Sequence, residues 1–385
     1  MNETHSGFAA ARPRPAGANR RGLLRWALVC LAALVGLLVA ALILLLIGAG
    51  TGPVPFLIGF TLATLPVPLY LSLALWLDRF EAEPKGLLAA AFGWGAVAAI
   101  AITLVVSGAA RIFVGIVWND AAADFSGAVI FAPVVEETAK ALVLFGICYF
   151  RRDEFDGVVD GIIYATMVGL GFAMTENIQY YGGAVLEGGV GGGIVLFFLR
   201  GGLGPYAHPL VTSMTGIGLG LASHTHNRAV KLFAPAAGLL LAMLLHGLWN
   251  LSATIHALAY FVVYFCVMVP VFAGVILAAV FGLRREGRIV RERLACDLQA
   301  GLISQREVEL LGSVRGRLGA SYAALRRGGL ASWRAQRRLH GVASELAFHR
   351  DRVARRARPA DGADSEREES YRREMRELRS RLLAR

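Results

Sequence analysis

The apolar stretch at residues 131–150 constrains the fold more than any other. It is apolar enough to lie in a bilayer, yet it carries Glu136, Glu137 and Lys140 near its middle. A charge at the centre of a membrane helix costs about 2.5–3.5 kcal/mol on insertion scales. These three charges are therefore expected to face the interior of a helix bundle or a watery cavity, so other helices must surround this one.

The spacing of the three charges allows one lysine to serve two carboxylates. Glu136 and Lys140 are four residues apart, and Glu137 and Lys140 are three apart, so all three lie on one helical face. One interpretation is a buried ion pair that only locks helix packing. The other is a functional site, which is what ionisable groups inside a membrane usually mark, and this is the hypothesis we favour.

Long apolar runs dominate the rest of the chain. Hydrophobic residues make up 56% of its 385 residues, and the mean hydropathy is +0.56. A run of about 20 apolar residues can cross the hydrocarbon core as a helix. The sequence therefore predicts an all-α fold, a polytopic bundle of about eight transmembrane helices. The predicted spans are residues 26–49, 54–77, 87–106, 128–150, 157–181, 205–222, 232–254 and 258–283.

The charges divide the chain into three predicted regions: a cytoplasmic segment at 1–25, the transmembrane domain at 26–283 and a basic tail at 284–385. Residues 1–283 hold 14 Lys and Arg against 14 Asp and Glu, whereas the tail holds 25 Arg, no Lys and 14 acidic residues. Lys and Arg concentrate in alternate loops, which predicts a cell-membrane protein with both termini in the cytoplasm. The tail is expected to contact anionic lipid. Interleaved acidic residues and the lack of a recognition motif argue against nucleic-acid binding.

Two segments have less definite predictions. Residues 182–204 are rich in glycine and then apolar, which suits a re-entrant loop, a surface helix or the start of a long span, and a plain loop is expected. In the tail, residues 289–300 and 307–318 have the spacing of short amphipathic helices. Residues 357–369 have the composition of a disordered linker, so the tail is predicted to be helical and partly disordered.

Five further polar side chains lie inside predicted spans: Glu176, Asn177, His208, His246 and Asn250. His246 and Asn250 are four residues apart and share one helical face. With a rise of about 1.5 Å per residue, the predicted topology places the glutamates and histidines at similar depth in the outer half of the membrane. Unrelated structural groups have no reason to share a layer, so these residues are candidates for one site.

The chemistry that fits these residue types is the activation of water. A glutamate can act as general base on a water that attacks an amide, and Asn250 can donate to the resulting oxyanion. Histidine and carboxylate are also zinc ligands, and a catalytic zinc keeps one position open for water. Glu176, His208 and His246 are the predicted zinc ligands, with Asn177 as a supporting polar group. The chain has no HExxH helix, no GxGD signature and no CxxC pair.

Several short motifs, taken in order, resemble the PrsW family of intramembrane proteases. They are Glu136-Glu137-x-x-Lys140, Gly171-Phe172-x-x-x-Glu176-Asn177-Ile178, His208, His246-x-x-x-Asn250 and the loop Asp78-Arg79-Phe80-Glu81-x-Glu83-Pro84. Each motif is short. Their order and their placement in successive spans make the resemblance specific, and it covers residues 78–250.

The resemblance implies an endopeptidase that cuts a membrane-associated protein, with a single-span anti-sigma factor as one substrate class. It implies that Glu136 or Glu137 is the general base, with His246 and Asn250 nearby, and that Lys140 tunes the glutamates. Glu176 stands where the wider superfamily often has histidine or asparagine, so the resemblance leaves open whether zinc is needed. The basic tail lies outside the resemblance.

Two other classes of function fit parts of the sequence. Glutamates and histidines inside a membrane also form proton relays, so a proton- or cation-coupled transporter is the alternative hypothesis. No inverted repeat or pair of broken helices supports it. A scaffold that recruits partners through its tail is the third hypothesis. Ion flux in liposomes would favour the transporter, and loss of function on tail deletion alone would favour the scaffold.

Overall fold

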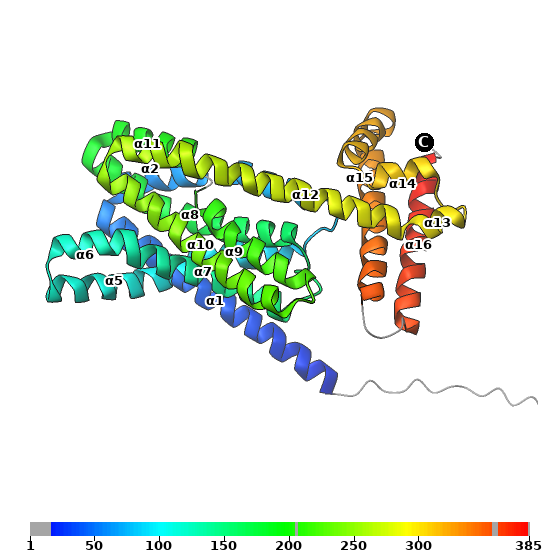
Figure 1. Cartoon of the computed structure of the whole chain (residues 1–385), viewed down its shortest axis with the longest axis horizontal. Coiled ribbons are helices and arrows are strands. Elements are labelled where there is room, and N and C mark those ends of the chain that lie inside the picture. Colours follow the sequence, from blue (N-terminus) through cyan, green and yellow to red (C-terminus); the bar gives the residue numbers. More distant parts are fainter. Residues whose placement is uncertain (1–16, 205–206, 356–360, 384–385) are drawn as a thin grey trace, which may run out of the picture.

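The computed structural model describes residues 17–204, 207–355 and 361–383, and these form helices without a strand. A long bundle makes up most of the molecule, and a smaller group of helices stands at one end of it (Figure 1). The bundle helices are α1 (Gly17–Thr51), α2 (Pro53–Thr64), α3 (Val67–Leu77), α4 (Lys85–Gly93), α5 (Ile100–Val117), α6 (Asp120–Ser126), α7 (Ala132–Phe150), α8 (Val158–Leu196), α9 (Ala207–His224), α10 (Arg228–Ile255), α11 (Ala257–Val263) and α12 (Val269–Arg293). Four π-helical segments join them: η1 (Trp94–Ala99), η2 (Gly127–Phe131), η3 (Phe197–Leu203) and η4 (Tyr264–Met268).

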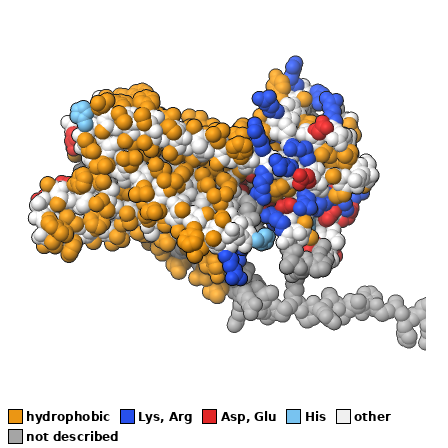
Figure 2. All heavy atoms as spheres, in the orientation of Figure 1, with side chains coloured by type: hydrophobic (Ala, Val, Ile, Leu, Met, Phe, Trp, Pro, Cys, Tyr) orange, Lys and Arg blue, Asp and Glu red, His pale blue; other side chains and the backbone are white. Residues whose placement is uncertain are grey.

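Apolar side chains cover the visible face of the bundle, whereas charged side chains gather on the smaller helical group (Figure 2). Within the described residues, six stretches are long and apolar enough to cross a membrane: Gly22–Thr51, Pro53–Leu77, Lys85–Val117, Val158–Ser223, Arg228–Ile255 and Ala257–Gln299. One stretch takes in both α8 and α9, and α7, with its three charges, is not among the six. The prediction of an all-α membrane bundle is confirmed, and the count of eight spans stays a prediction.

Helix α8 lies at the centre of the bundle. Its buried side chains contribute to three apolar clusters, through Ile163, Phe172 and Ile162 respectively. Glycine lets α9 approach α8 closely, because a Cβ atom on Gly161 would collide with the carbonyl oxygen of Gly216 and the reverse also holds. Small residues allow such close backbone contact between membrane helices. This contact fixes the position of α9, which carries His208.

Residues 182–204 do not form the expected loop. Helix α8 continues to Leu196 and breaks only at Gly189, whose φ of 63° is open to glycine but strained for other residues. After the break at Gly189 the chain folds back on α8. A Cβ atom on Gly192 would collide with Ala184, and one on Gly193 would collide with Val185. Of the three interpretations of this segment, the re-entrant loop is nearest to the structure, which is a helical hairpin. The hairpin returns Arg200 to the level of Glu176.

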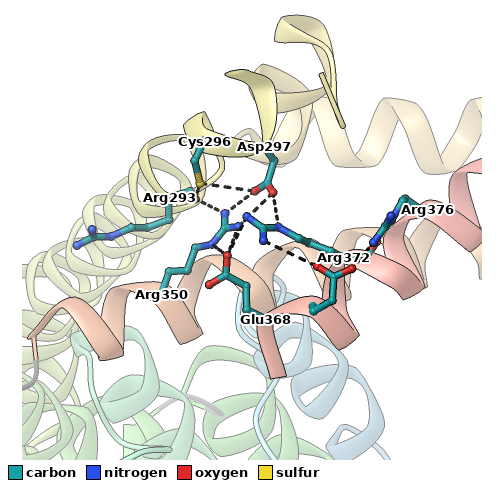
Figure 3. Close-up of polar contacts among 8 residues, drawn as sticks. Arg293, Cys296, Asp297, Arg350, Glu368, Arg372 and Arg376 are labelled. Carbon is teal, nitrogen blue, oxygen red and sulfur yellow. Dashed lines mark hydrogen bonds and ion pairs between the residues drawn. The ribbon is translucent and has the colours of Figure 1, made fainter. Parts of the chain in front are cut away.

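The tail forms a packed group of helices: α13 (Ala295–Gln299), α14 (Gln305–Leu311), α15 (Val314–Arg355) and α16 (Gly362–Leu383). Buried Asp297 anchors it, because the guanidinium groups of Arg350 and Arg372 both donate to its carboxylate, and Arg350 also pairs with Glu368 (Figure 3). The predicted linker at 357–369 is wrong from residue 362 onward, where α16 begins, and residues 356–360 lie outside the described part. Ion pairs with the rest of the tail order this charged sequence.

The predicted bounds of the tail helices also need correction. Helix α12 runs without a break from the membrane bundle to Arg293, so residues 289–293 extend a span and do not start a new helix. The segment expected at 307–318 is divided between α14 and the long helix α15. Amphipathic spacing shows which residues face inward, but it does not show where one helix joins the next.

Candidate functional site

Helix α7 turns its three charges inward. Its buried face includes Pro133, Glu136, Glu137, Lys140 and Leu144, with the spacing of one side of a helix. The Lys140 side chain is 0% exposed, and its ammonium lies 3.8 Å from the centre of the Phe172 ring. The sequence prediction that these charges face the bundle interior is confirmed by their burial.

Glu137 has a full set of partners. Lys140 Nζ donates to its Oε1 at 2.8 Å, and His246 Nδ1 lies 3.0 Å from the same oxygen. The hydroxyl of Thr212 on α9 donates to Oε2 at 2.9 Å. These contacts satisfy a buried carboxylate on both oxygens. They also orient the His246 ring, because Nδ1 must carry the proton that it donates.

Glu136 is held more loosely. Its Oε2 lies 3.4 Å from Lys140 Nζ and 3.8 Å from His246 Nε2. Glu136 is also one of the residues that line a cavity of about 720 Å³, which Glu137 does not reach. The two adjacent glutamates therefore differ, since one is saturated with hydrogen bonds and the other faces open space.

His208 joins the two halves of the site. Its Nδ1 lies 3.0 Å from Lys140 Nζ, and its Nε2 lies 2.9 Å from Glu176 Oε2. An ammonium group can only donate, so Nδ1 accepts and Nε2 carries the proton. Glu176, predicted as a zinc ligand, is thus a partner of His208, and it also accepts from Arg200 Nη2 at 2.6 Å.

The structure places the two predicted asparagines beside the central cluster. Asn177 Oδ1 accepts from Arg200 Nε at 2.9 Å, so it helps to hold this guanidinium. Asn250 lies one turn from His246 on α10, and its Nδ2 donates to the carbonyl oxygen of Ala128 at 2.9 Å. Neither amide forms a described hydrogen bond with Glu136 or Glu137.

The donor atoms that converge most closely belong to Glu136, His208 and His246. One ligand atom from each lies within 4.8 Å of the others, and all three residues are buried. The tautomers deduced above leave a lone pair on His246 Nε2, whereas the lone pair of His208 Nδ1 accepts from Lys140 Nζ, so a metal at His208 would replace that hydrogen bond. A carboxylate with two imidazoles is a known donor set of catalytic zinc, so the residues present fit a zinc ion. The converging carboxylate among the described residues is that of Glu136, and the role of Glu176 as a ligand stays a prediction.

The sequence did not indicate the roles of Arg200, Thr212 and Phe172, although Phe172 stands in one of the motifs that resemble the family. Arg200 follows an apolar run inside the segment 182–204, where a lone arginine near the membrane indicates a carboxylate partner. Thr212 lies four residues after His208 and so shares its helical face. Phe172 carries no polar signal, and only the fold shows that Lys140 lies over its ring.

Comparison with known proteins shows the family of the chain. The model of one protein family, described as PrsW family intramembrane metalloprotease, matches residues 83–275. Protease PrsW of Oceanobacillus iheyensis is 36% identical over 118 residues, which is 30% of this chain and 49% of that protein. Protease PrsW of Geobacillus kaustophilus is 31% identical over 173 residues, 45% of this chain and 69% of that protein.

A third relative, Protease PrsW of Bacillus subtilis, is 33% identical over 121 residues, which is 31% of this chain and 50% of that protein. The chain thus spans about half the length of two of these curated relatives and 69% of the other. No solved structure gives a significant match. Helix α1 and the tail helices α13–α16 lie outside the matched region.

Proposed function

The chain belongs to the PrsW family of intramembrane metalloproteases, and we propose that it is an endopeptidase that hydrolyses a peptide bond of a membrane protein. One observation carries the proposal. Glu136, His208 and His246 come from three different helices, and their donor atoms converge in a buried layer of the bundle. Glutamate and histidine at this distance suit the activation of water for attack on an amide.

We assign different roles to the two adjacent glutamates. In the site without metal, Glu136 is the general base, because it faces the cavity and its hydrogen bonds are long; with zinc bound it would be a ligand instead. It takes a proton from the attacking water and passes it to the leaving amine. Glu137 positions His246 and balances the charge of Lys140 through its short hydrogen bonds. A positioned base of this kind contributes about 10²–10⁴-fold to a rate.

Zinc is the proposed metal, with Glu136, His208 and His246 as the residues that would hold it. A bound zinc ion would act as a Lewis acid on water and on the peptide carbonyl. Glu137 and Glu176 each hold the protonated nitrogen of one histidine. Such partners fix the ring orientation of metal-binding histidines. The same hydrogen bonds keep both lone pairs in place when the site works without metal.

Asn250 remains the candidate donor to the oxyanion. Its amide has two N–H groups, and the bond to Ala128 uses one of them. Arg200 adds a positive charge near the site and neutralises Glu176. This leaves Glu136 as the carboxylate with the weakest ion pairing in the cluster.

The substrate class follows from the position of the site. A reaction centre buried among membrane-spanning helices acts on a polypeptide that shares the bilayer, and a single-span protein such as an anti-sigma factor is the proposed substrate. The basic tail is proposed to lie against anionic lipid on the cytoplasmic side. No feature of the described residues adds support to the alternative hypothesis of a coupled transporter.

Replacement of both Glu136 and Glu137 by Gln tests the proposal. The double variant is expected to insert into the membrane with lower thermal stability, because the Lys140 ammonium loses both carboxylate partners, and to lose cleavage of a single-span reporter protein by at least about 10²-fold. Glu154 lies in a loop, and Arg151 is its ion-pair partner among the described residues, so Glu154→Gln is the control and keeps full activity. Complete cleavage of the reporter by the double variant would refute the proposal.

A further inference from the structure

The cavity that Glu136 lines opens sideways between α1, α5 and α8. Glu136, Phe172 and Glu176 form its inner end. Leu46 on α1, Leu104 on α5 and Leu186 on α8 form its rim, and their side chains are 57%, 44% and 58% exposed. These exposed leucines belong to the apolar surface of the bundle. The cavity therefore leads from the lipid-facing surface to the candidate base.

We propose that this cavity is the substrate cleft and that it receives an unwound stretch of a membrane-spanning polypeptide. The inference rests on the proposed function and adds the place and the conformation in which the substrate is bound. A peptide bond inside a helix is shielded by its own hydrogen bonds and by side chains. An unwound stretch exposes that bond, but its free N–H and C=O groups then need polar partners within the membrane.

The walls of the cavity offer such partners. Thr103 on α5 lines the cavity, and its buried hydroxyl has no hydrogen-bond partner among the described residues. A buried hydroxyl without a partner destabilises the structure, and a backbone group of a bound peptide would supply the missing partner. Thr175 and Gln179 on α8 add further polar groups to the lining. The Thr175 hydroxyl already donates to the carbonyl oxygen of Ala96, but a lipid chain would fill the same volume and leave the Thr103 hydroxyl unpaired, so a polypeptide is the better occupant.

Helix α1 is the wall best suited to move. Among the described residues of α1, the buried side chains are Ile43, Ile47 and Thr51, which form one short contact surface at the end of the helix. Gly52, with a φ of 85°, separates α1 from α2. Beyond this contact surface the described side chains of α1 are mostly exposed. A helix held along about two turns can shift aside to admit a substrate segment, whereas no residue of α8 from 159 to 178 is exposed.

Photocrosslinking tests the cleft with two synthetic single-span peptides. One has a leucine–alanine membrane segment interrupted by Gly-Pro, and the other has the same segment without interruption. p-Benzoylphenylalanine replaces Leu104 or Leu46 at the rim. The matched controls replace Val105 or Leu45, which are 71% and 68% exposed and lie outside the cavity lining. The full chain is used in lipid nanodiscs, so labelling is measured without any need for cleavage.

The interrupted peptide is expected to label the Leu104 and Leu46 positions about ten times more than the Val105 and Leu45 positions. The uninterrupted peptide should label all four positions weakly and equally. Equal labelling by the interrupted peptide at rim and control positions, or labelling of lipid alone, would overturn the cleft. Cleavage of the interrupted peptide is measured separately. Selective labelling without cleavage would support the proposed cleft and refute the proposed protease activity. Cleavage without selective labelling would support the protease activity and refute the cleft.

Discussion

Lys140 is the residue on which the charge balance of the site depends. Its fully buried ammonium contacts Glu136, Glu137 and His208 and lies over the ring of Phe172. A buried charge is tolerated only while its partners remain, and removal of one member of a buried pair typically costs about 3–5 kcal/mol. Lys140 therefore ties the geometry of the candidate site to the stability of the bundle.

Lys140→Met is expected to lower the free energy of unfolding by about 3–5 kcal/mol, because it leaves two carboxylates uncompensated. Addition of Glu137→Gln should restore part of that stability but none of the activity. Thermal unfolding in detergent measures both variants. Lys231→Met, which changes an exposed lysine, is the control. If Lys140→Met unfolds at the wild-type temperature, Lys140 does not hold the charges together.

The second prediction at the residue scale concerns zinc and the two histidines His208 and His246. Protein purified without chelators is expected to hold about one zinc ion per chain, and His208→Ala with His246→Ala should lose it. Elemental analysis measures the content without reference to activity. His226→Ala changes an exposed histidine and should keep the metal. A metal-free preparation that still cleaves its substrate would leave water activation to the glutamates and histidines alone.

The residues of the site were more predictable than their contacts. Glu136, Glu137, His208 and His246 stand out in sequence because ionisable groups are rare in membrane helices. Their pairing depends on helix rotation, which the sequence does not give. For this reason the sequence could not show that Glu176 is paired with Arg200 while Glu136 lies beside the histidines.

At the scale of elements, the contact between α8 and α9 decides whether the site is assembled. Gly161→Ala would place a methyl group against the backbone of Gly216, and overpacking of this kind typically costs about 1–3 kcal/mol. The variant is expected to unfold at a lower temperature and to cleave more slowly. Gly146→Ala on α7 meets open space and serves as the control. If Gly161→Ala unfolded at the same temperature as the wild-type protein, close contact between α8 and α9 would not be needed for stability.

The apolar runs in the sequence predicted most of the membrane helices, but they did not predict where each helix begins and ends. Residues 182–204 contain many glycines, and composition alone favoured a loop. Packing against the rest of α8 keeps this segment helical, and only Gly189 breaks it. Similarly, residues 362–369 are polar enough to suggest disorder, yet Arg350 and Arg372 bind Glu368 in α16. In both places, packing and ion pairs override what the local composition indicates.

At the scale of the whole molecule, the tail is attached to the bundle through the loop at residues 78–84. Phe80 from this loop is 2% exposed and belongs to the apolar core of the tail. Arg317 lies over the Phe80 ring and donates to the carbonyl oxygen of Arg79 at 2.9 Å. Arg352 pairs with Glu81 in the same loop. A loop that resembles a family element thus also serves as the attachment point of the tail.

Phe80→Ala is expected to weaken this attachment by about 3–5 kcal/mol, because it removes a buried aromatic side chain from the core of the tail. The tail should then be cut more rapidly by trypsin at its arginines, while the bundle stays intact. Tyr149→Ala changes an aromatic side chain that is 64% exposed and should not alter the digestion. Unchanged digestion of Phe80→Ala would show that the tail is held by other contacts.

Helix α12 belongs to two apolar cores at once. Val275 and Ala279 pack in the cluster that contains Leu210 and Leu245, which are close neighbours of His208 and His246 in sequence. Val290, about four turns further along the same helix, packs in the core of the tail. A continuous helix of this kind is a lever arm. A force that tilts the tail is delivered, without a hinge to absorb it, to the helices that carry the two histidines.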